Sequence, residues 1–460
     1  MKLKCSFIKP RAMNKIERIY FIGAGGIGMS ALARYFVHLG KPVAGYDKTR
    51  TLLTDTLESE GIALHFEDAV SQIPEAFRTP EGTLVVYTPA IPDSHSELNY
   101  FRSRHFQIKK RAEVLGLISS NSRCLAVAGT HGKTTTSCIL AHLLHEAGLE
   151  FTAFLGGVSE DFGSNFVLEG TEFTVVEADE YDRSFLWLTP EVACVTSMDA
   201  DHLDIYGSGE ALEESFREFA GKLKIGGTLL VRKGLPLKGL SYGIEDDSDF
   251  CIRNLRQDAD GYLFSIQTPQ QEFEEVRFSK PGHHNLLNSL AAFAMAMQVT
   301  KDPEPLIRGL GTFKGVERRF SVMHKGEQQV YVDDYAHHPR EIDAVYQALR
   351  ENYPSARILA VFQPHLFSRT RDFGGDFARS LSRFDEIWLM DIYPAREQPI
   401  AGIDSEWLLE QIENSNKKMV SKIDLIPEIR ARKPQVLVTM GAGDIGQQAQ
   451  FIKKALRDAS

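Results

Sequence analysis

Short apolar runs alternate with amphipathic stretches along the whole chain, and the first such pair lies near the N-terminus. The apolar residues 19–22 run into a glycine turn, and apolar side chains then recur at helical spacing at Met29, Leu32, Ala33 and Phe36. Further strands are expected at "PVAGYD" and "TLVVYTPAI". Because strands that alternate with helical patterns form parallel sheets with crossover connections, this part of the chain predicts an α/β domain.

Two more blocks repeat this pattern. In the middle of the chain, the strand "CLAVAG" is followed by an apolar stripe at helical spacing, and "EFTVVEAD", "EVACVTSMDADH" and "GTLLVRKG" predict further strands. Residues 243–279 carry short alternating runs typical of antiparallel strands. The last block has expected strands at "QVYVDDYAHHP", "RILAVFQPH", "EIWLMDIYP" and "QVLVTMGAGD". The expected fold is three α/β domains, at residues 1–111, 112–318 and 319–460.

Length and composition agree with several ordinary globular domains. The 460 residues exceed what one hydrophobic core supports, and 43% hydrophobic and 25% charged residues are typical of a globular protein. The net charge of −10 argues against a nucleic-acid or anionic-membrane partner, which would need clustered positive charge. The five cysteines form no CxxC pair, and no apolar run suits a signal peptide or a bilayer span. We expect a cytoplasmic protein, either a monomer or a homodimer.

A glycine motif follows the first expected strand. Gly23, Gly25 and Gly28 have the G-x-G-x-x-G spacing, which permits a tight turn and a close approach of backbone amides to a phosphate at a helix start. Asp47 ends the second strand, about where a dehydrogenase would hold a ribose hydroxyl. The motif predicts a diphosphate ligand and leaves open whether it is NAD or another nucleotide.

The segment "GTHGKTTT" predicts a phosphate loop. Gly129 and Gly132 allow backbone amides to surround phosphates, Lys133 neutralises their charge, and a threonine hydroxyl reaches Mg²⁺. Helix capping alone would explain the threonines but not the lysine between them and a glycine. Val127 stands where the usual G-x-x-x-x-G-K pattern has its first glycine. The loop is therefore shorter than that of a generic kinase or GTPase.

Acidic side chains end the two strands that follow the loop. Mg²⁺ bound to a nucleotide needs oxygen ligands besides the phosphates, and carboxylates supply them. A single charged loop is usually only solvated, but two acidic strand ends in the block with the phosphate loop favour a metal site. The candidates are Glu177, Asp179, Glu180 and Asp182 at the first strand end, and Asp199, Asp201, His202 and Asp204 at the second.

Polar groups also gather at a later helix and at the strand ends of the last block. "GHHNLLNSLAA" carries amides at i and i+3, which share a helix face suited to a nucleotide base, and "GVERRF" carries an arginine pair suited to phosphate. In open α/β sheets ligands bind at the carboxyl ends of strands. The basic groups there predict a site for a carboxylate or phosphate. The polar residues of this helix, of the arginine pair and of the strand ends are His284, Asn285, Asn288, Arg318, Arg319, Asp334, His337, His365, Arg369 and Arg371.

The ordered set of motifs resembles the Mur ligase family over nearly the whole chain. The motifs are "GAGGIGMSALA", "RAEVL", "AGTHGKTTT", "EADEYDRSFL", "DADHLD", "HHNLLNSLAA", "GVERRF", "DDYAHHP", "FQPHLFSRTRD", "GIDS" and "GAGDIG". The resemblance implies an N-terminal Rossmann-like UDP-binding domain, a central P-loop ATPase-type domain, and a C-terminal Rossmann-like domain that admits an amino acid. It is strongest to members that join L-alanine to UDP-N-acetylmuramate through an acyl phosphate, with ATP and Mg²⁺, in peptidoglycan precursor synthesis.

The resemblance also implies roles for individual residues. UDP-sugar contacts are expected from Gly23, Ala24, Gly25, Gly26, Ile27, Gly28, Met29, Ser30, Asp47, Thr88, Arg111 and Glu113. ATP contacts are expected from Gly129, Thr130, His131, Gly132, Lys133, Thr134, Thr135, His284, Asn285, Asn288, Arg319 and Asp334. Tyr335, His337, His365 and Arg369 would bind the amino acid, and Thr134, Glu177 and His202 the metal. The groups expected to act in catalysis are Lys133, Glu177, His202 and Arg319.

The chain departs from the family pattern at three places, and alternatives to the alanine reaction remain. Several relatives carry a carbamylated lysine where "ALEESFREFA" has none, Leu366 stands where relatives often have a polar residue, and Ser197 stands where asparagine is common. A ligase that recycles murein tripeptide onto the same sugar nucleotide would share "EADEYD" but is not expected to carry "FQPHLFSRTRD". An NAD-dependent oxidoreductase would leave "GTHGKTTT" and "GVERRF" unexplained. A nucleotide switch would explain the phosphate loop but not the basic site of the third domain.

Overall fold

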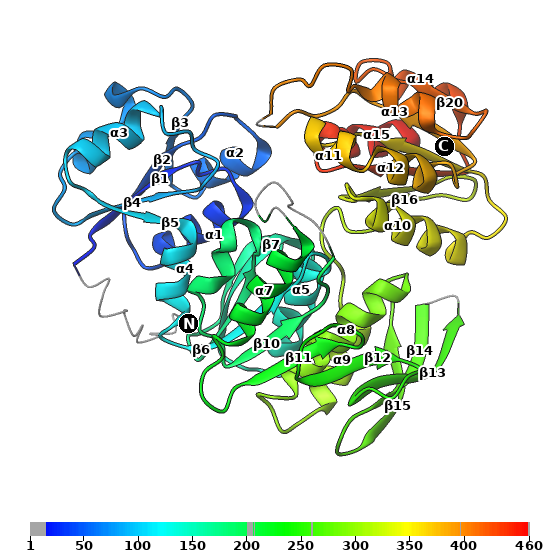
Figure 1. Cartoon of the computed structure of the whole chain (residues 1–460), viewed down its shortest axis with the longest axis horizontal. Coiled ribbons are helices and arrows are strands. Elements are labelled where there is room, and N and C mark those ends of the chain that lie inside the picture. The colour runs from blue at the N-terminus through cyan, green and yellow to red at the C-terminus, as the bar shows by residue number, and fades with distance from the viewer. Residues whose placement is uncertain (1–14, 200–205, 207, 259–260, 396, 459–460) are drawn as a thin grey trace. The chain divides into compact units, whose positions relative to one another are not determined.

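The computed structural model describes residues 15–199, 206, 208–258, 261–395 and 397–458 (Figure 1). The chain forms two compact units. One contains the described residues up to Ser279 together with Leu287–Lys314, and the other contains Lys280–Leu286 and the described residues from Gly315 onward. Three sheets lie within them, two in the first unit and one in the second. The predicted three-domain α/β architecture is therefore confirmed.

The N-terminal sheet is parallel throughout and has the strand order β3-β2-β1-β4-β5. Its strands are β1 (Arg18–Ile22), β2 (Val43–Tyr46), β3 (Ala63–His65), β4 (Thr83–Tyr87) and β5 (Gln107–Lys110). Its helices are α1 (Ile27–His38), α2 (Leu52–Ser59), α3 (Ser96–Ser103) and α4 (Arg111–Ser119). Because the chain order reverses at β1, the carboxyl ends of β1 and β4 form the switch point where such sheets bind ligands.

Alternation along β1 explains why the sheet is covered on both faces. Ile19 and Phe21 pack into the core that includes α1, whereas Tyr20 and Ile22 pack into a second core with α3. Parallel sheets need apolar cover on both faces, and this strand supplies apolar side chains to each. Gly23 then turns the chain with a φ of 90°, and α1 begins after Gly26.

The central domain is built on a ten-stranded sheet with the order β15-β14-β13-β12-β11-β10-β6-β9-β7-β8. The strands are β6 (Arg123–Ala128), β7 (Phe151–Ser159), β8 (Ser164–Leu168), β9 (Phe173–Ala178), β10 (Val192–Val195), β11 (Thr228–Arg232), β12 (Leu240–Ile244), β13 (Phe250–Asp258), β14 (Gly261–Gln267) and β15 (Glu272–Phe278). The helices are α5 (Lys133–Glu146), α7 (Gly209–Ala220), α8 (His283–Ala296), which crosses the unit boundary, and α9 (Glu304–Thr312). The predicted antiparallel pieces are the pairs β13–β14 and β14–β15.

Helix α5 is buried on every side rather than along one stripe. All eleven residues from Thr134 to Leu144 are buried, because α9 and the strands β7 and β9 pack around the helix. The phosphate loop therefore leads into a helix that is enclosed over most of its length. A helix fixed on all sides gives the backbone amides at its start a rigid position.

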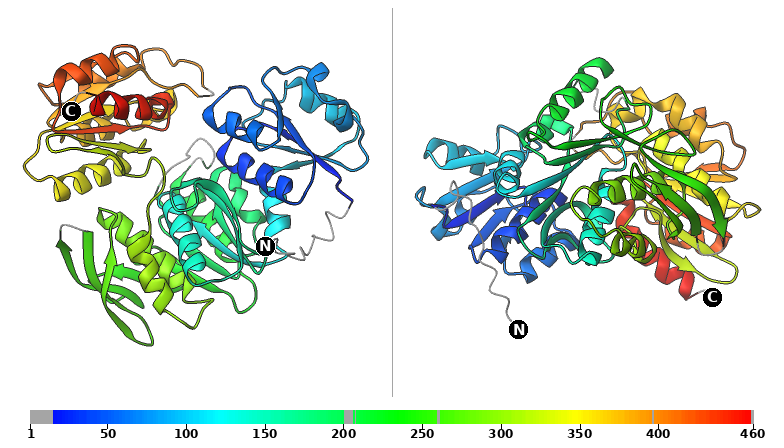
Figure 2. Two further views of the ribbon diagram at one scale, coloured as in Figure 1. Left: turned by 180° about the vertical axis from the view of Figure 1, so that it is seen from behind. Right: turned by 90° about the horizontal axis from the view of Figure 1, so that it is seen from below.

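The C-terminal sheet has the order β16-β17-β21-β18-β19-β20 and is parallel except for the edge strand β16. Its strands are β16 (Ser321–Lys325), β17 (Val330–Asp334), β18 (Ile358–Phe362), β19 (Glu386–Leu389), β20 (Lys417–Met419) and β21 (Val436–Met440). Its helices are α10 (Pro339–Asn352), α11 (Phe367–Asp372), α12 (Gly374–Leu381), α13 (Ser405–Gln411), α14 (Leu425–Arg432) and α15 (Ala449–Arg457), which cover both faces (Figure 2). The four predicted strands are β17, β18, β19 and β21.

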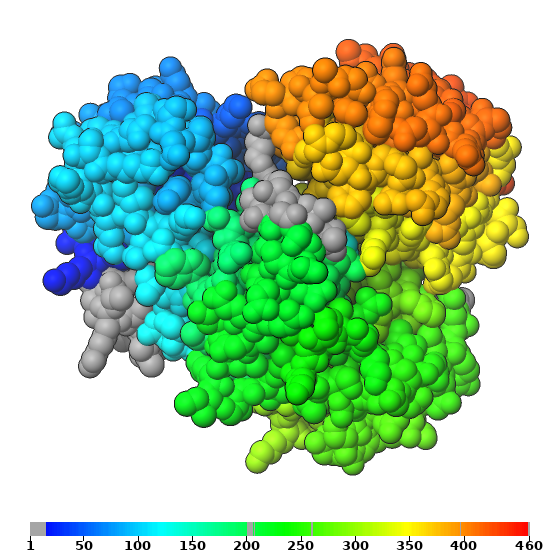
Figure 3. Space-filling model, viewed as in Figure 1, coloured from blue at the N-terminus to red at the C-terminus, as the bar shows by residue number. Residues whose placement is uncertain are grey.

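Within the first unit, the N-terminal and central domains meet along α1. Figure 3 shows the surface of the N-terminal part, blue to cyan, meeting that of the central part in green. Asn165 on β8 is fully buried and donates to the Ile27 carbonyl (2.6 Å) and to Ser30 Oγ (2.9 Å), while it accepts from Arg34. Each polar group of this amide therefore has a partner on the helix that follows the glycine motif. No helix among the described residues is long and apolar enough to cross a membrane.

Asn165→Ala is expected to loosen the contact between α1 and β8. It removes the acceptor of Arg34 Nη1 and the amide that donates to Ser30 Oγ and to the Ile27 carbonyl, although Arg34 keeps Glu60; the loss costs about 1–3 kcal/mol of the free energy of unfolding of this unit. Hydrogen exchange of peptides from α1 and β8, followed through urea unfolding, measures the effect. Gln347→Ala on the exposed face of α10 is the matched control. Equal protection in both variants would contradict the role of Asn165.

Candidate active site

The phosphate loop is a tight turn between β6 and α5 that only glycine permits at two positions. Gly129 has a φ of 137° and Gly132 a φ of 83°, both in the region that other residues rarely adopt. A Cβ atom at Gly129 would lie 2.1 Å from Thr196 Oγ1, and one at Gly132 would lie 2.5 Å from Asn288 Oδ1. The loop therefore packs closely against the end of β10 and against α8. Asn288, which is predicted to contact ATP, thus lies beside the loop.

Ser197 fastens the loop to the end of β10. Its hydroxyl accepts from the His131 amide (2.7 Å) and lies 3.0 Å from Thr130 Oγ1, while its carbonyl accepts from the Thr130 amide (3.3 Å). Thr130 and the first-turn residue Thr135 of α5 are both buried. Ser197 is therefore a short side chain that binds the loop backbone directly.

Lys133 points back into the loop and into a cluster of carboxylates. Its Nζ donates to the Gly129 carbonyl (2.7 Å) and to both oxygens of Glu180 (2.7 and 3.0 Å). Burial disfavours the charged ammonium, but Glu180, Asp179 and Glu177 outweigh burial and raise the pKa of Lys133 above its ordinary value. The lysine therefore stays a cation in the centre of the loop.

Thr134 and Glu177 form the described part of the expected metal site. Thr134 Oγ1 donates to Glu177 Oε2 at 3.0 Å and to Oε1 at 3.2 Å. A hydroxyl and a carboxylate side by side at a helix start are the hard oxygen donors that fit Mg²⁺ beside nucleotide phosphates. The third expected ligand, His202, lies outside the described residues. Across the parts of the chain that are described, no cluster of three His, Cys, Asp or Glu side chains suits a metal.

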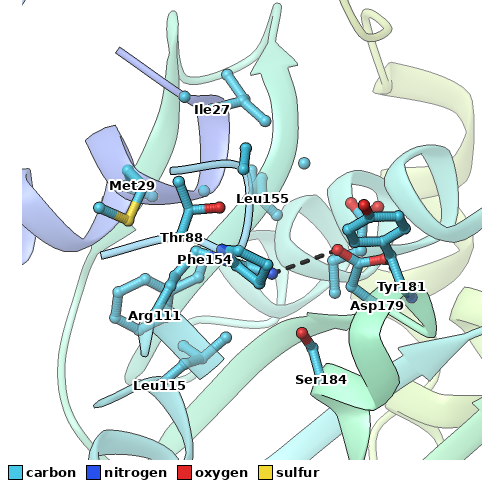
Figure 4. Close-up of a pocket in the computed structure, with 17 residues that line it drawn as sticks. Ile27, Met29, Thr88, Arg111, Leu115, Phe154, Leu155, Asp179, Tyr181 and Ser184 are labelled. Carbon is cyan, nitrogen blue, oxygen red and sulfur yellow. Dashed lines mark hydrogen bonds and ion pairs between the residues drawn. The ribbon is translucent and has the colours of Figure 1, made fainter. Parts of the chain in front are cut away.

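A cavity of about 330 Å³ lies beside this site, between the two domains of the first unit (Figure 4). The glycine turn contributes Gly26, Ile27, Gly28 and Met29, the N-terminal domain adds Thr88, Pro89, Ala90 and Arg111, and the central domain adds Phe154, Leu155, Gly156, Glu177, Asp179, Tyr181 and Ser184. Arg111 Nη2 pairs with Asp179 Oδ2 at 3.3 Å, and a Cβ at Gly28 would come within 2.8 Å of Arg111 Nη1. The third glycine thus gives Arg111 the space to reach the turn.

Six residues expected at the UDP-sugar site do not line this cavity, and most of them support its walls. Asp47 accepts from the amides of Gly25 (2.7 Å) and Thr49 (3.0 Å), so its carboxylate holds the glycine turn. Ser30 is fully buried at the contact with Asn165, and Glu113 caps the start of α4 by accepting from the Lys110 amide. The six residues are Gly23, Ala24, Gly25, Ser30, Asp47 and Glu113.

The central-domain wall of the cavity was not anticipated from the sequence. Phe154 and Leu155 belong to β7, and Tyr181 and Ser184 lie in the short helix Tyr181–Trp187 after β9. No local motif marks these residues as ligand contacts. Phe154 and Leu155 reach the cavity because β7 packs against α1, and Tyr181 and Ser184 reach it because their short helix packs against α4.

In the second unit, Asp334 and the arginine pair are fixed by the turn between α9 and β16. Asp334 accepts from the amides of Phe320 (2.6 Å) and Ala336 (2.7 Å). Burial raises the pKa of Asp334 to about 6, although the Arg319 guanidinium and these amides pull it down. The Arg318 and Arg319 guanidinium groups lie 5.2 and 5.1 Å from the Tyr335 ring centre. Arg318 is bound to Asp333, which leaves Arg319 as the phosphate candidate.

The histidines expected at the amino-acid site come together at neighbouring strand ends. The His337 and His365 rings are 6.0 Å apart, and His365 stacks on Tyr393 at 5.8 Å. Burial lowers the pKa of His337 to about 4, with Glu341 opposing, so its ring is neutral. Arg369 is buried in α11, whereas Arg371 is exposed and pairs with Asp372. Arg371 therefore lies outside this cluster.

Two residues of the α8 segment have local partners in the second unit. Asn285 Nδ2 donates to the Pro281 carbonyl at 2.7 Å. Burial lowers the pKa of His284 to about 4, with Glu351 opposing, and its ring packs against Gly282. Their predicted contacts with ATP stay predictions.

Three α/β domains with a phosphate loop and an adjoining cavity define a nucleotide-binding enzyme. The chain matches three family models: "Mur ligase family, catalytic domain" at residues 18–123, "Mur ligase middle domain" at 127–296, and "Mur ligase, glutamate ligase domain" at 318–443. The chain belongs to the Mur ligase family. Membership gives no support to the oxidoreductase alternative that the glycine motif and Asp47 had left open.

Relatives and solved structures agree with this family. The chain is 56% identical to the UDP-N-acetylmuramate–L-alanine ligase of Flavobacterium psychrophilum, over 96% of this chain and 99% of the relative. It is 46% identical to the enzyme of the same name from Parabacteroides distasonis, over 96% and 98%. The solved UDP-N-acetylmuramate–alanine ligase of Thermotoga maritima superposes with a TM-score of 0.82 at 26% identity, over 96% and 100%. A murein peptide ligase from Psychrobacter arcticus has a TM-score of 0.71 at 22% identity, over 96% and 98%, which shows a shared fold.

Gly129→Ala is expected to disable the phosphate loop, because the added Cβ collides with Thr196 and the backbone requires a positive φ. We expect the affinity for ADP to fall by about tenfold or more, measured by calorimetric titration. The control is Gly209→Ala, at the start of α7, where an added Cβ meets nothing within 4 Å. A folded Gly129→Ala protein with unchanged ADP affinity would show that the loop does not bind the phosphates.

Proposed function

We propose that this protein joins L-alanine to the carboxylate of UDP-N-acetylmuramate at the expense of ATP, giving UDP-N-acetylmuramoyl-L-alanine, ADP and phosphate. One observation carries the proposal: Glu177 lines the cavity beside the glycine turn and also accepts from Thr134 at the start of α5. A sugar nucleotide in the cavity and a nucleotide on the phosphate loop would therefore meet at this carboxylate. The names of the relatives point to the same substrates.

The residues suit activation of a carboxylate. Its carbon is electron-rich and its oxygen leaves poorly, so an amine does not attack it directly. Transfer of the γ-phosphoryl group of ATP makes an acyl phosphate, which the alanine amine attacks to expel phosphate. This chemistry depends on positioning and charge neutralisation more than on a protein nucleophile. Lys133 provides positive charge at the loop, and Arg111 provides it at the wall of the cavity.

Mg²⁺ would be held by Thr134 and Glu177, where it would neutralise phosphate charge and orient the γ-phosphoryl group. Arg319, Asp334, Asn285 and His284 are proposed to contact ATP. The same proposal places the reaction in the cytoplasm, as a step of peptidoglycan precursor synthesis.

The amino acid is proposed to bind in the C-terminal domain at Tyr335, His337, His365 and Arg369. The buried Arg369 guanidinium suits the alanine carboxylate. The neutral His337 ring adds no positive charge of its own that would repel the amine. Leu366 has a φ of 71° next to His365, a backbone conformation that is costly outside glycine and is found where function requires it.

Release of ADP and phosphate is expected only when UDP-N-acetylmuramate and L-alanine are both present with ATP, because the acyl phosphate needs both the sugar carboxylate and the amine to turn over. A coupled assay for ADP, with each substrate omitted in turn, makes the measurement. The second arm replaces alanine with the murein tripeptide L-alanyl-γ-D-glutamyl-meso-diaminopimelate. Turnover with the tripeptide that matches turnover with alanine would assign the chain to the recycling reaction instead.

A further inference from the structure

The buried side chain of Glu180 binds the lysine of the phosphate loop. Glu180 is fully buried, and both of its carboxylate oxygens lie within 3.0 Å of Lys133 Nζ. The same Nζ donates to the Gly129 carbonyl at 2.7 Å. Glu180 was one of several acids that the sequence marked as a possible metal ligand, and its partner here is a cation of the protein itself.

The backbone around Glu180 is held from several sides. The Glu180 carbonyl accepts from Tyr206 Oη at 2.6 Å and from the Arg183 amide at 2.9 Å. Asp182 and Arg183, which follow after Tyr181, both have a φ of 52°, in the left-handed region. The chain therefore turns sharply after Glu180, and this turn keeps the glutamate side chain beneath the loop.

Three of the four acids at this strand end have different partners. Glu177 accepts from Thr134, Asp179 pairs with Arg111 at the cavity, and Glu180 binds Lys133. The oxygens suited to a metal and the oxygens that bind the lysine thus belong to different side chains. Removal of Lys133 from Glu180 would leave a fully buried carboxylate without its charge partner, which is strongly unfavourable.

A lysine ammonium has three N–H donors. The Gly129 carbonyl and the two Glu180 oxygens accept all three in this structure, so a nucleotide phosphate would share or replace one of these acceptors. We propose that Glu180 is a positioning residue for phosphoryl transfer: it holds the Lys133 ammonium inside the loop before and after the nucleotide binds. This inference rests on the proposed function, because it assumes that ATP phosphates occupy the loop.

The activity test compares Glu180→Gln and Glu180→Asp with wild type. Glutamine keeps the shape but loses the charge, and aspartate keeps the charge but withdraws it by one methylene. Both are expected to lower kcat by about 10- to 100-fold, the range for loss of a charge-assisted hydrogen bond, with KM for UDP-N-acetylmuramate within about twofold of wild type. Glu191→Gln breaks the Arg123–Glu191 pair (2.7 Å) in the same domain and is expected to leave kcat unchanged.

Two results would overturn the proposal. A full kcat in Glu180→Asp would show that charge alone is needed and position is not. A kcat in Glu180→Gln that recovers at high Mg²⁺ concentration would make Glu180 a metal ligand. Thermal unfolding of each variant separates a loss of fold from a loss of positioning, and Glu180→Asp keeps the charge balance of the buried cluster if the neutral variant fails to fold.

A second measurement does not depend on the reaction. Acetic anhydride labels amines, and mass spectrometry of the wild type is expected to show slow labelling of Lys133, with and without ADP. Glu180→Gln is expected to speed it by about tenfold or more, since the amine loses its buried charge partner, whereas Lys222 serves as an exposed reference. Unchanged labelling would overturn the role of Glu180. A wild type that lacks ligase activity would contradict the proposed function alone.

Discussion

The site depends on one buried positive charge, the ammonium of Lys133 at the start of α5. A lone ammonium in this place would be unstable, and three carboxylates from one strand end keep it charged. Because helix α5 is enclosed on every side, the lysine backbone cannot move to find another partner. The charge is therefore in place before any phosphate arrives, which is the condition for electrostatic stabilisation without reorganisation.

The end of β9 distributes its acids by the geometry of the strand and the turn after it. Glu177 still belongs to the strand and lies against Gly156 of β7, where a Cβ atom would collide with its carboxylate. Asp179 and Glu180 follow the strand, and they diverge toward the N-terminal domain and toward the phosphate loop. One short segment therefore links the cavity beside the glycine turn, the proposed metal site and the loop lysine. Arg111 and Lys133 offset the charges of Asp179 and Glu180, so these acids do not by themselves prevent an anion from binding nearby.

Sequence patterns predicted the parts of the fold that local physics determines. The three α/β domains, the phosphate loop and the strand ends with their polar residues follow from hydrophobic periodicity and glycine spacing. The edge strands β16 and β20 were not predicted, because the edge of a sheet buries little and carries a weak pattern. Phe154 and Tyr181 were missed for another reason: each reaches the cavity through packing between distant segments, which no local pattern records.

The same limit applies to Ser30 and Asp47, which were expected to contact the sugar nucleotide and are not among the residues that line the cavity. A motif identifies the turn that surrounds a phosphate, but it does not separate residues that contact the ligand from those that hold the turn. Asp47 holds the turn through the Gly25 amide, and Ser30 holds it through Asn165 of the central domain. Asn165 lies on β8 and Glu177 lies on β9, and both strands belong to the central sheet. The same sheet therefore positions the glycine turn and the carboxylate of Glu177. Substitutions at Ser30 or Asp47 should therefore change the shape of the cavity, although neither residue lines it.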